Sequence, residues 1–154
     1  MSVAGAIVGG IVDSSGVVGG GVTESDGDAR YERIVNGGFA NGASWTIANT
    51  TWQITGGHAE TLSSAGGNGL NQSFVEVAAG KTLAVTFDVA NAPTPLLLTV
   101  KLTSSGTPVQ TIYFDGPSGA VSISVVATNS FDGIRFETPS TDNGLELDNV
   151  SLIA

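Results

Sequence analysis

Cysteine is absent from this chain of 154 residues, and histidine occurs only once, at His58. The absence of cysteine excludes a disulfide framework, a thiolate metal site and a cysteine nucleophile. A catalytic zinc centre is not expected with one histidine, and a serine hydrolase is not expected because no Gly-x-Ser-x-Gly segment occurs. We therefore interpret His58 as a surface or turn residue.

Charged residues are scarce and mostly acidic. They make up 12% of the chain, against about 25% in a typical soluble protein, and the net charge is −9. Binding to nucleic acid and to anionic membrane surfaces depends on Lys and Arg, of which the chain has five, so neither partner is expected. Cations and neutral polymers are the ligands that this charge favours.

Long hydrophobic runs are missing as well. The apolar run Val3–Val12 ends at Asp13 after roughly ten residues, half of the ~20 that a membrane helix needs. No Lys or Arg precedes it, as the first part of a secretory leader would require. We expect a protein that is made in the cytoplasm without a leader.

Residues 1–30 are rich in glycine and valine and differ from the rest of the chain. The run Ile7–Val12 is echoed ten residues later by Val17–Val22. Glycine opposes helix, whereas valine and isoleucine favour extended backbone. Because the segment cannot bury its apolar side chains alone, it docks on a partner, forms part of the domain or is a disordered tail. We expect the first, an anchoring or assembly arm whose apolar residues are Ile7, Val8, Ile11, Val12, Val17, Val18 and Val22.

From residue 31 onward, apolar and polar residues alternate in short runs separated by Gly, Pro, Asn and Asp. This pattern is typical of strands joined by tight turns. The expected strands cover residues 51–55, 58–62, 70–77, 82–90, 96–103, 109–114, 121–127, 133–137 and 145–153. Eight or nine antiparallel strands at this spacing predict an all-β domain over residues 31–154, a jelly-roll β-sandwich with almost no helix.

The alternation also assigns side chains to the two faces of each expected strand. The residues expected in the core include Trp52, Ile54, Leu83, Val85, Phe87, Val89, Val121, Ile123 and Val125. Tyr113 is the best candidate for an exposed aromatic ring, because its neighbours Ile112 and Phe114 would face the other way.

Three motifs in a fixed order carry a resemblance to a known family. Asn36-Gly37-Gly38-Phe39, followed by Trp45, opens the domain, and the pair Leu70–Val77 and Leu83–Val89 lies at its centre. Leu145–Leu152 closes it. Over about residues 34–154, the chain resembles the galactose-binding-like jelly rolls of carbohydrate-binding modules, which also occur on bacteriophage virion proteins. The resemblance implies that Trp45 is a core plug.

The resemblance also implies binding sites. In such modules an acid of the last strand and groups near the opening loop often hold a structural calcium; Asp148 matches that acid, and Glu32 could add a second carboxylate. Ala40 stands where the family usually has an acidic residue. Without a metal, Asp148 would hydrogen-bond the opening loop, and no other cofactor is expected. A glycan would stack on an exposed ring, for which Tyr113 is the candidate.

Catalysis is not expected. Glu146 and Asp148 would lie on one face of the last strand, about 7 Å apart, a spacing that paired glycosidase carboxylates could use. No aromatic-lined cleft accompanies them in the sequence. The chain is therefore interpreted as non-enzymatic.

These features predict a structural protein of a phage particle, either a capsid decoration protein or a tail or fibre appendage. It would be made in the host cytoplasm and located in the virion. The arm would bind other virion proteins or sister copies by strand addition, giving a homo-oligomer, and the sandwich would project and touch host glycans. The alternative is a secreted or surface carbohydrate-binding module, extracellular and monomeric. A calcium-stabilised adhesin fragment is a third reading.

Overall fold

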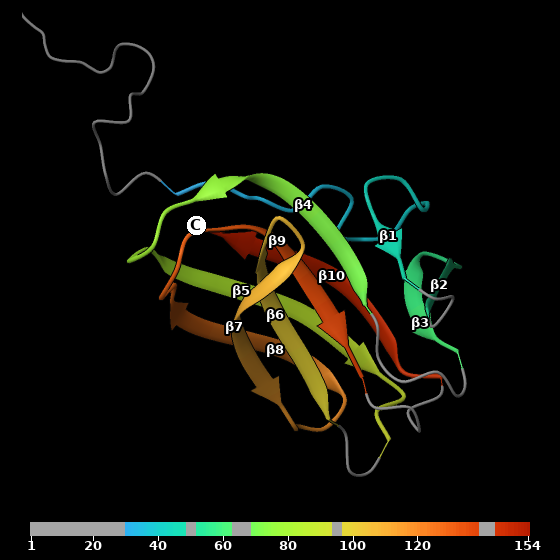
Figure 1. Ribbon diagram of the computed structural model, residues 1–154. Helices are drawn as coiled ribbons and strands as arrows, with labels where there is room; N and C mark the ends of the chain where they lie inside the picture. Colours follow the sequence, from blue (N-terminus) through green and yellow to red (C-terminus); the bar gives the residue numbers. More distant parts are fainter. Residues whose placement is uncertain (1–29, 49–51, 63–68, 94–96, 139–143) are drawn as a thin grey trace, which may run out of the picture. The chain divides into compact units, whose positions relative to one another are not determined.

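The structure is a computed structural model that describes residues 30–48, 52–62, 69–93, 97–138 and 144–154 (Figure 1). The chain divides into two units, Met1–Tyr31 and Glu32–Ala154, and the strands belong to the second. The expected arm, with its seven apolar residues from Ile7 to Val22, lies outside the described residues, so its role stays a prediction.

Ten strands form two antiparallel five-stranded sheets, and the described residues contain no helix. The front sheet has the order β1 (Thr46–Ile47), β4 (Leu70–Val77), β9 (Phe131–Glu137), β6 (Leu98–Ser104) and β7 (Thr107–Phe114). The back sheet has the order β2 (Trp52–Thr55), β3 (His58–Thr61), β10 (Glu146–Ile153), β5 (Thr82–Ala90) and β8 (Gly119–Val126). The predicted all-β sandwich is confirmed. None of the described segments forms a helix that could span a membrane.

The core lies between the two sheets and follows the alternation in the sequence. The side chains expected there are buried or packed against buried residues: Trp52, Ile54, Leu83, Val85, Phe87, Val89, Val121, Ile123 and Val125. Phe87 of the back sheet contacts Phe114 and Phe136 of the front sheet edge to face, with ring centroids 5.9 and 5.5 Å apart. Complete burial of a side chain of this size stabilises the fold by about 1.5–3 kcal/mol.

The opening motif is locked onto the last strand. A Cβ atom at Gly37 would lie 1.9 Å from the carbonyl oxygen of Val150, so only glycine fits there. The Val150 N–H donates to the Gly37 carbonyl at 3.0 Å. This donor is available because β10 bulges between Asp148 and Ser151, where Asn149 has a φ of 50° and Val150 has no register partner on β5.

Trp45 is the core plug that the resemblance implied. Its ring is buried and lies 5.0 Å from that of Phe39, between centroids. Its indole Nε1 donates to the Asn36 carbonyl at 2.9 Å. The Asn36 side chain in turn holds the loop closed, since it accepts from the Ala40 N–H at 2.9 Å and donates to the Ala43 carbonyl at 3.0 Å.

The first residues of the unit, 32–35, form its leading segment, which is held by a side chain on one flank and by backbone on the other. The buried amide of Gln72 accepts from the Val35 N–H at 2.7 Å and donates to the Val35 carbonyl at 2.9 Å. On the other flank, Glu32 forms an isolated β-bridge with Ile153. The first and last residues of the sandwich are therefore neighbours.

Nine of the ten strands match the expected ones to within two residues at each end, and the differences have local causes. The expected gap between residues 103 and 109 is a tight hairpin, in which Ser105 (φ 49°) and Gly106 (φ 82°) form the two-residue turn. Pro108 does not interrupt β7, because β7 is an edge strand and its outer side needs no backbone donor. The two-residue β1 was not expected from the sequence.

Candidate functional site

A row of polar side chains crosses the outer face of the front sheet. The register places Thr46 opposite Asn71, Asn71 opposite Arg135, Arg135 opposite Lys101, and Lys101 opposite Thr111. Residues directly opposite on antiparallel strands have Cβ atoms about 4.5–5.5 Å apart. Five strands thus bring five polar residues into one line, which we call the polar row.

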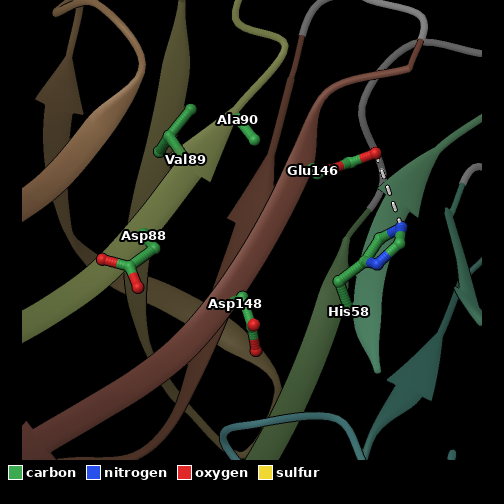
Figure 2. A pocket seen from close by; sticks show the side chains of 6 residues that line it. All are labelled: His58, Asp88, Val89, Ala90, Glu146 and Asp148. Atoms are coloured by element: carbon green, nitrogen blue, oxygen red, sulfur yellow. Dashed lines mark ion pairs between the residues drawn. The ribbon is translucent and has the colours of Figure 1, made fainter. Parts of the chain in front are cut away.

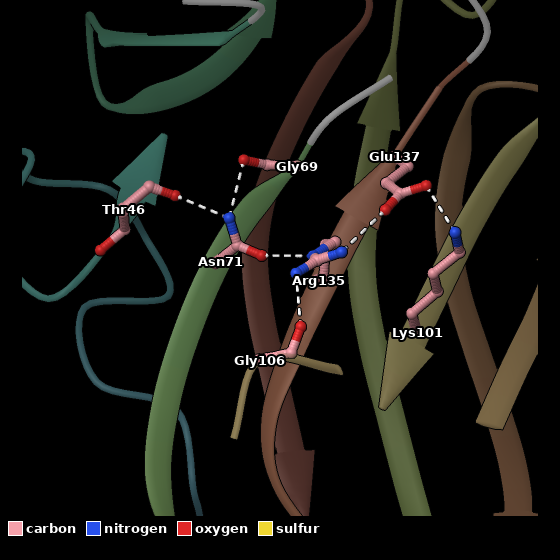
Figure 3. Close-up of polar contacts among 7 residues, drawn as sticks. All are labelled: Thr46, Gly69, Asn71, Lys101, Gly106, Arg135 and Glu137. Carbon is pink, nitrogen blue, oxygen red and sulfur yellow. Dashed lines mark hydrogen bonds and ion pairs between the residues drawn. The ribbon is translucent and has the colours of Figure 1, made fainter. Parts of the chain in front are cut away.

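Hydrogen bonds and ion pairs hold the middle of the polar row in place (Figure 3). Arg135 Nε donates to Asn71 Oδ1 at 2.7 Å, and Arg135 Nη2 donates to the Gly106 carbonyl at 2.8 Å. Glu137 lies between two cations, with Oε1 2.7 Å from Lys101 Nζ and Oε2 3.4 Å from Arg135 Nη1. The Asn71 amide also donates to the Gly69 and Thr46 carbonyls, at 3.0 and 3.3 Å. These contacts fix the orientation of each charged group before any ligand arrives.

The absence of a side chain at Gly69 leaves room for Arg135. A Cβ atom at Gly69 would lie 2.5 Å from Arg135 Cγ and 2.8 Å from its Cδ, so the arginine stem runs directly over this glycine. The side chains of Arg135 and Lys101 each remain 24% exposed. Their charged ends are therefore supported by the sheet and reachable from solvent.

Tyr113 stands beside the polar row. It lies opposite Thr99, which is itself opposite Glu137, so a second row of residues runs next to the first. Tyr113 is 80% exposed, while Ile112 and Phe114 pack against the core. The predicted exposure of this ring is confirmed. Its role in binding a ligand stays a prediction.

The outer face of the back sheet is acidic. Register places Glu60 opposite Glu146 and Asp88 opposite Asp148. A cavity of about 190 Å³ is lined by four ionisable side chains and two apolar residues: His58, Asp88, Val89, Ala90, Glu146 and Asp148 (Figure 2). His58 Nε2 lies 3.6 Å from Glu146 and 3.8 Å from Glu60. The expected shared face of Glu146 and Asp148 is confirmed, and His58 lies on the surface of strand β3.

The structure does not bring Asp148 and Glu32 together. Asp148 Oδ1 accepts from the Asn149 N–H at 2.7 Å, and Asn149 Nδ2 donates to Asp88 at 2.8 Å. The carboxylate of Glu32 lies farther along β10, where it accepts from the Leu152 N–H at 2.9 Å and from the Ser151 hydroxyl.

These residues do not fit a calcium site, which needs about six to eight oxygen ligands. Both carboxylate oxygens of Glu32 are used in closing the leading segment onto β10. Within the described ranges, no group of three or more His, Asp or Glu side chains is arranged to hold a metal. Asp148 also makes no hydrogen bond to the opening loop among the described contacts; the Val150 backbone makes that connection.

The polar row was not expected from the sequence. Asn71, Lys101 and Arg135 come from strands that are far apart in the sequence, and only the register of β4, β9 and β6 aligns them. A signal was nevertheless present. Lys101 and Arg135 are the only Lys or Arg residues inside expected strands, and each is flanked by two apolar neighbours. A charge at such a position must lie on the outward face, and two of them point to one charged sheet surface.

Comparison with known proteins gives no sequence match but several structural ones. The sequence matches no family model and no curated protein. The enzymatically active domain of bacteriophage CBA120 tailspike protein 4 superposes with a TM-score of 0.57 at 14% identity, over 79% of this chain and 21% of that one. The chain thus corresponds to about a fifth of the tailspike structure.

Two carbohydrate-binding structures are matched over nearly their whole length. A module described as CBM4 has a TM-score of 0.58 at 18% identity, over 72% of this chain and 94% of that one. The second N-terminal cellulose-binding domain of Cellulomonas fimi beta-1,4-glucanase C has a TM-score of 0.55 at 18% identity, over 81% of this chain and 95% of that one. These likenesses show the fold: the chain carries a jelly-roll β-sandwich of the carbohydrate-binding-module type, as its motifs indicated.

Proposed function

We propose that Glu32–Ala154 is a non-catalytic carbohydrate-binding module and that the outer face of the front sheet binds the glycan. The observation that carries this proposal is the position of Tyr113, an 80% exposed ring beside a row of fixed hydrogen-bonding groups. A sugar ring has one apolar face and a rim of hydroxyl groups. The apolar face can stack on the tyrosine ring, and the hydroxyls can form hydrogen bonds with the side chains of the polar row.

The dimensions and rigidity of the face support this proposal. Adjacent strands lie about 4.8 Å apart, so the polar row extends roughly 19 Å from Thr46 to Thr111, long enough for several sugar units in a chain. Because Asn71, Arg135 and Glu137 already hold one another, a ligand meets groups that lose little conformational entropy on binding.

The chemistry of the face supports binding without catalysis. Glycoside hydrolysis in most families uses two carboxyl groups on opposite sides of the scissile bond. Among the described residues of the two rows, Glu137 is the one carboxylate, and it is held between Lys101 and Arg135. Such a group is an acceptor and a counter-ion, and among the described residues no second carboxylate lies in these rows.

The test is affinity electrophoresis of the full chain through gels that contain single polysaccharides, with an empty gel as reference. Retardation by at least one polysaccharide is expected. Tyr113→Ala should weaken that binding about tenfold, since stacking on an exposed ring is lost, while Tyr113→Phe should bind like the wild type. Equal binding by Tyr113→Ala, or no retardation by any polysaccharide, would contradict the proposal.

We further propose that the module is part of a phage particle, located in the virion after assembly in the host cytoplasm, as a decoration, tail or fibre component. The similarity to a tailspike domain supports this assignment. Residues 1–30 would be the anchoring arm, with sister copies or other virion proteins as partners. An extracellular carbohydrate-binding module is the alternative.

Light scattering tests whether the arm assembles copies of the chain. The full chain is compared with a chain that starts at Tyr31, at the same concentration. A virion component that assembles through its arm should be oligomeric as the full chain and monomeric without residues 1–30. Two monomers would contradict self-assembly through the arm and would leave two possibilities, docking of the arm on another virion protein or the extracellular module.

A further inference from the structure

The charge of the molecule is distributed unequally over the two sheet faces. The chain has five Lys and Arg residues, and two of them, Lys101 and Arg135, stand directly opposite each other on the front sheet. The back sheet carries Glu60, Asp88, Glu146 and Asp148 on its outer face, described above. The net charge of −9 therefore does not describe the face that we propose binds the glycan.

The two cations share a single counter-ion. Glu137 contacts both Lys101 and Arg135, and within the described residues neither cation has a second carboxylate partner. The three charges leave this part of the face with a local charge of +1. A ligand with one negative group would restore neutrality, whereas a neutral ligand would leave the positive charge uncompensated.

Donors remain on both cations. An ammonium has three N–H groups and a guanidinium has five. The contacts with described residues use one on Lys101, to Glu137, and three on Arg135, to Asn71, Glu137 and Gly106. Two N–H groups on each side chain therefore stay available, and both side chains are 24% exposed. Charge-assisted hydrogen bonds to a carboxylate are the strongest that such donors make.

Resting on the proposed glycan-binding function, we propose that the ligand is an acidic polysaccharide, with a sugar carboxylate bound by Lys101 and Arg135 and an adjacent sugar stacked on Tyr113. The register supports the second contact: Lys101 lies opposite Thr111, two residues before Tyr113 on β7. Diagonal neighbours of this kind are about 7–8 Å apart, within reach of long side chains. Among the described residues Tyr113 is the one exposed ring beside the polar row, so ionic contacts would supply part of the affinity that ring stacking supplies for a neutral glycan.

An acidic ligand differs from the cations and neutral polymers that the overall composition favoured. The acidic side chains of the back sheet repel a polyanion, whereas Lys101 and Arg135 of the front sheet attract it. The molecule would therefore approach such a polymer with the front sheet first.

The experiment measures dissociation constants of the full chain, by isothermal titration, for polygalacturonate and for the same polymer after reduction of its carboxyl groups to alcohols. The two polymers share their backbone and length and differ in charge. Polygalacturonate should bind at least tenfold more tightly than the reduced polymer at low salt. The difference should shrink in 0.5 M NaCl, where exposed charges are screened.

Three variants test the site: one should weaken binding, one should strengthen it, and one is a control. Lys101→Gln should weaken binding of polygalacturonate about fivefold, because one of two cations is lost while Arg135 keeps its contact with Glu137. Glu137→Gln should strengthen it about fivefold, because the local charge rises from +1 to +2. Lys81→Gln is the matched control: it changes the net charge as much as Lys101→Gln does, lies before β5, and should leave binding unchanged. A purely structural role of Glu137 would lower binding in Glu137→Gln.

The outcomes separate the two proposals. Charge-dependent binding with the expected order of variants supports the acidic ligand. Equal binding of both polymers, or equal effects of Lys101→Gln and Lys81→Gln, overturns the acidic ligand and leaves the glycan-binding function standing. If the chain binds xylan or a β-glucan but not polygalacturonate, the acidic ligand is likewise overturned and the glycan-binding function stands. Absence of binding to all of these polysaccharides overturns both proposals.

Discussion

Replacing Gly37 by alanine tests the contact on which the fold depends most directly. The added Cβ would lie 1.9 Å from the Val150 carbonyl oxygen and 2.9 Å from its carbonyl carbon. Both are backbone atoms of the central strand β10, which pairs with β3 and β5 and cannot move away freely. The opening loop must therefore shift, and the hydrogen bond from Val150 N to the Gly37 carbonyl, 3.0 Å in length, is lost.

The expected cost follows from these two effects. Forcing extra atoms into a packed site costs about 1–3 kcal/mol, and the lost hydrogen bond adds about 1 kcal/mol. The free energy of unfolding should therefore fall by about 2–4 kcal/mol. For a unit of this size, the melting temperature should fall by roughly 8–16 °C.

Urea unfolding followed by tryptophan fluorescence measures this cost, because Trp45 and Trp52 are both buried. The midpoint should fall without a change in the m-value. Gly42→Ala is the matched control: no atom lies within 4 Å of its added Cβ, so its stability should stay within about 0.5 kcal/mol or rise slightly. If Gly37→Ala unfolds within 0.5 kcal/mol of the wild type, the opening motif and the last strand are not locked together as described.

Three further substitutions have expected outcomes. Gln72→Leu leaves the N–H and the carbonyl of Val35 without their partners, so the urea midpoint should report a loss of about 1–3 kcal/mol. Asp148→Asn removes one of two carboxylates that face each other across β10 and β5, so stability in low salt should rise by about 0.2–1 kcal/mol; a loss that appears only in calcium buffer would restore the metal-site interpretation. Tyr113→Ala should leave the melting temperature unchanged, since the ring is 80% exposed; a large fall would assign the ring to the core.

The strands were predictable because their signal is local. Alternation in Leu83–Val89 depends on neighbouring residues alone, and the buried and exposed faces of β5 follow it. The order of strands in a sheet depends on residues far apart in the chain. β10 lies between β3 and β5, and nothing in the sequence of β10 itself indicates these neighbours. The hairpin at Ser105 was not expected because its first turn residue is a serine with positive φ. Glycine or asparagine at that position would have indicated such a turn.

The candidate site shows the same division. Exposure of Tyr113 could be derived from Ile112 and Phe114, its neighbours in sequence. The alignment of the polar row could not be derived, because Arg135 pairs with Asn71 and Lys101, which are 64 and 34 residues away in the chain. The calcium expectation combined one family position, Asp148, with a nearby carboxylate, Glu32, and in this chain both carboxylates accept hydrogen bonds from backbone N–H groups.

The bridge between Glu32 and Ile153 has a consequence for how this module can be joined to other proteins. Because the two ends of the sandwich meet, the unit can be spliced into a surface loop of a host protein without forcing that loop apart, and the entropy lost in closing the loop stays small. The same geometry allows circular permutation: a short linker across Glu32 and Ala154 could move the chain ends to another turn. The sandwich can therefore be joined to another protein either at a chain end or as an insertion within a loop.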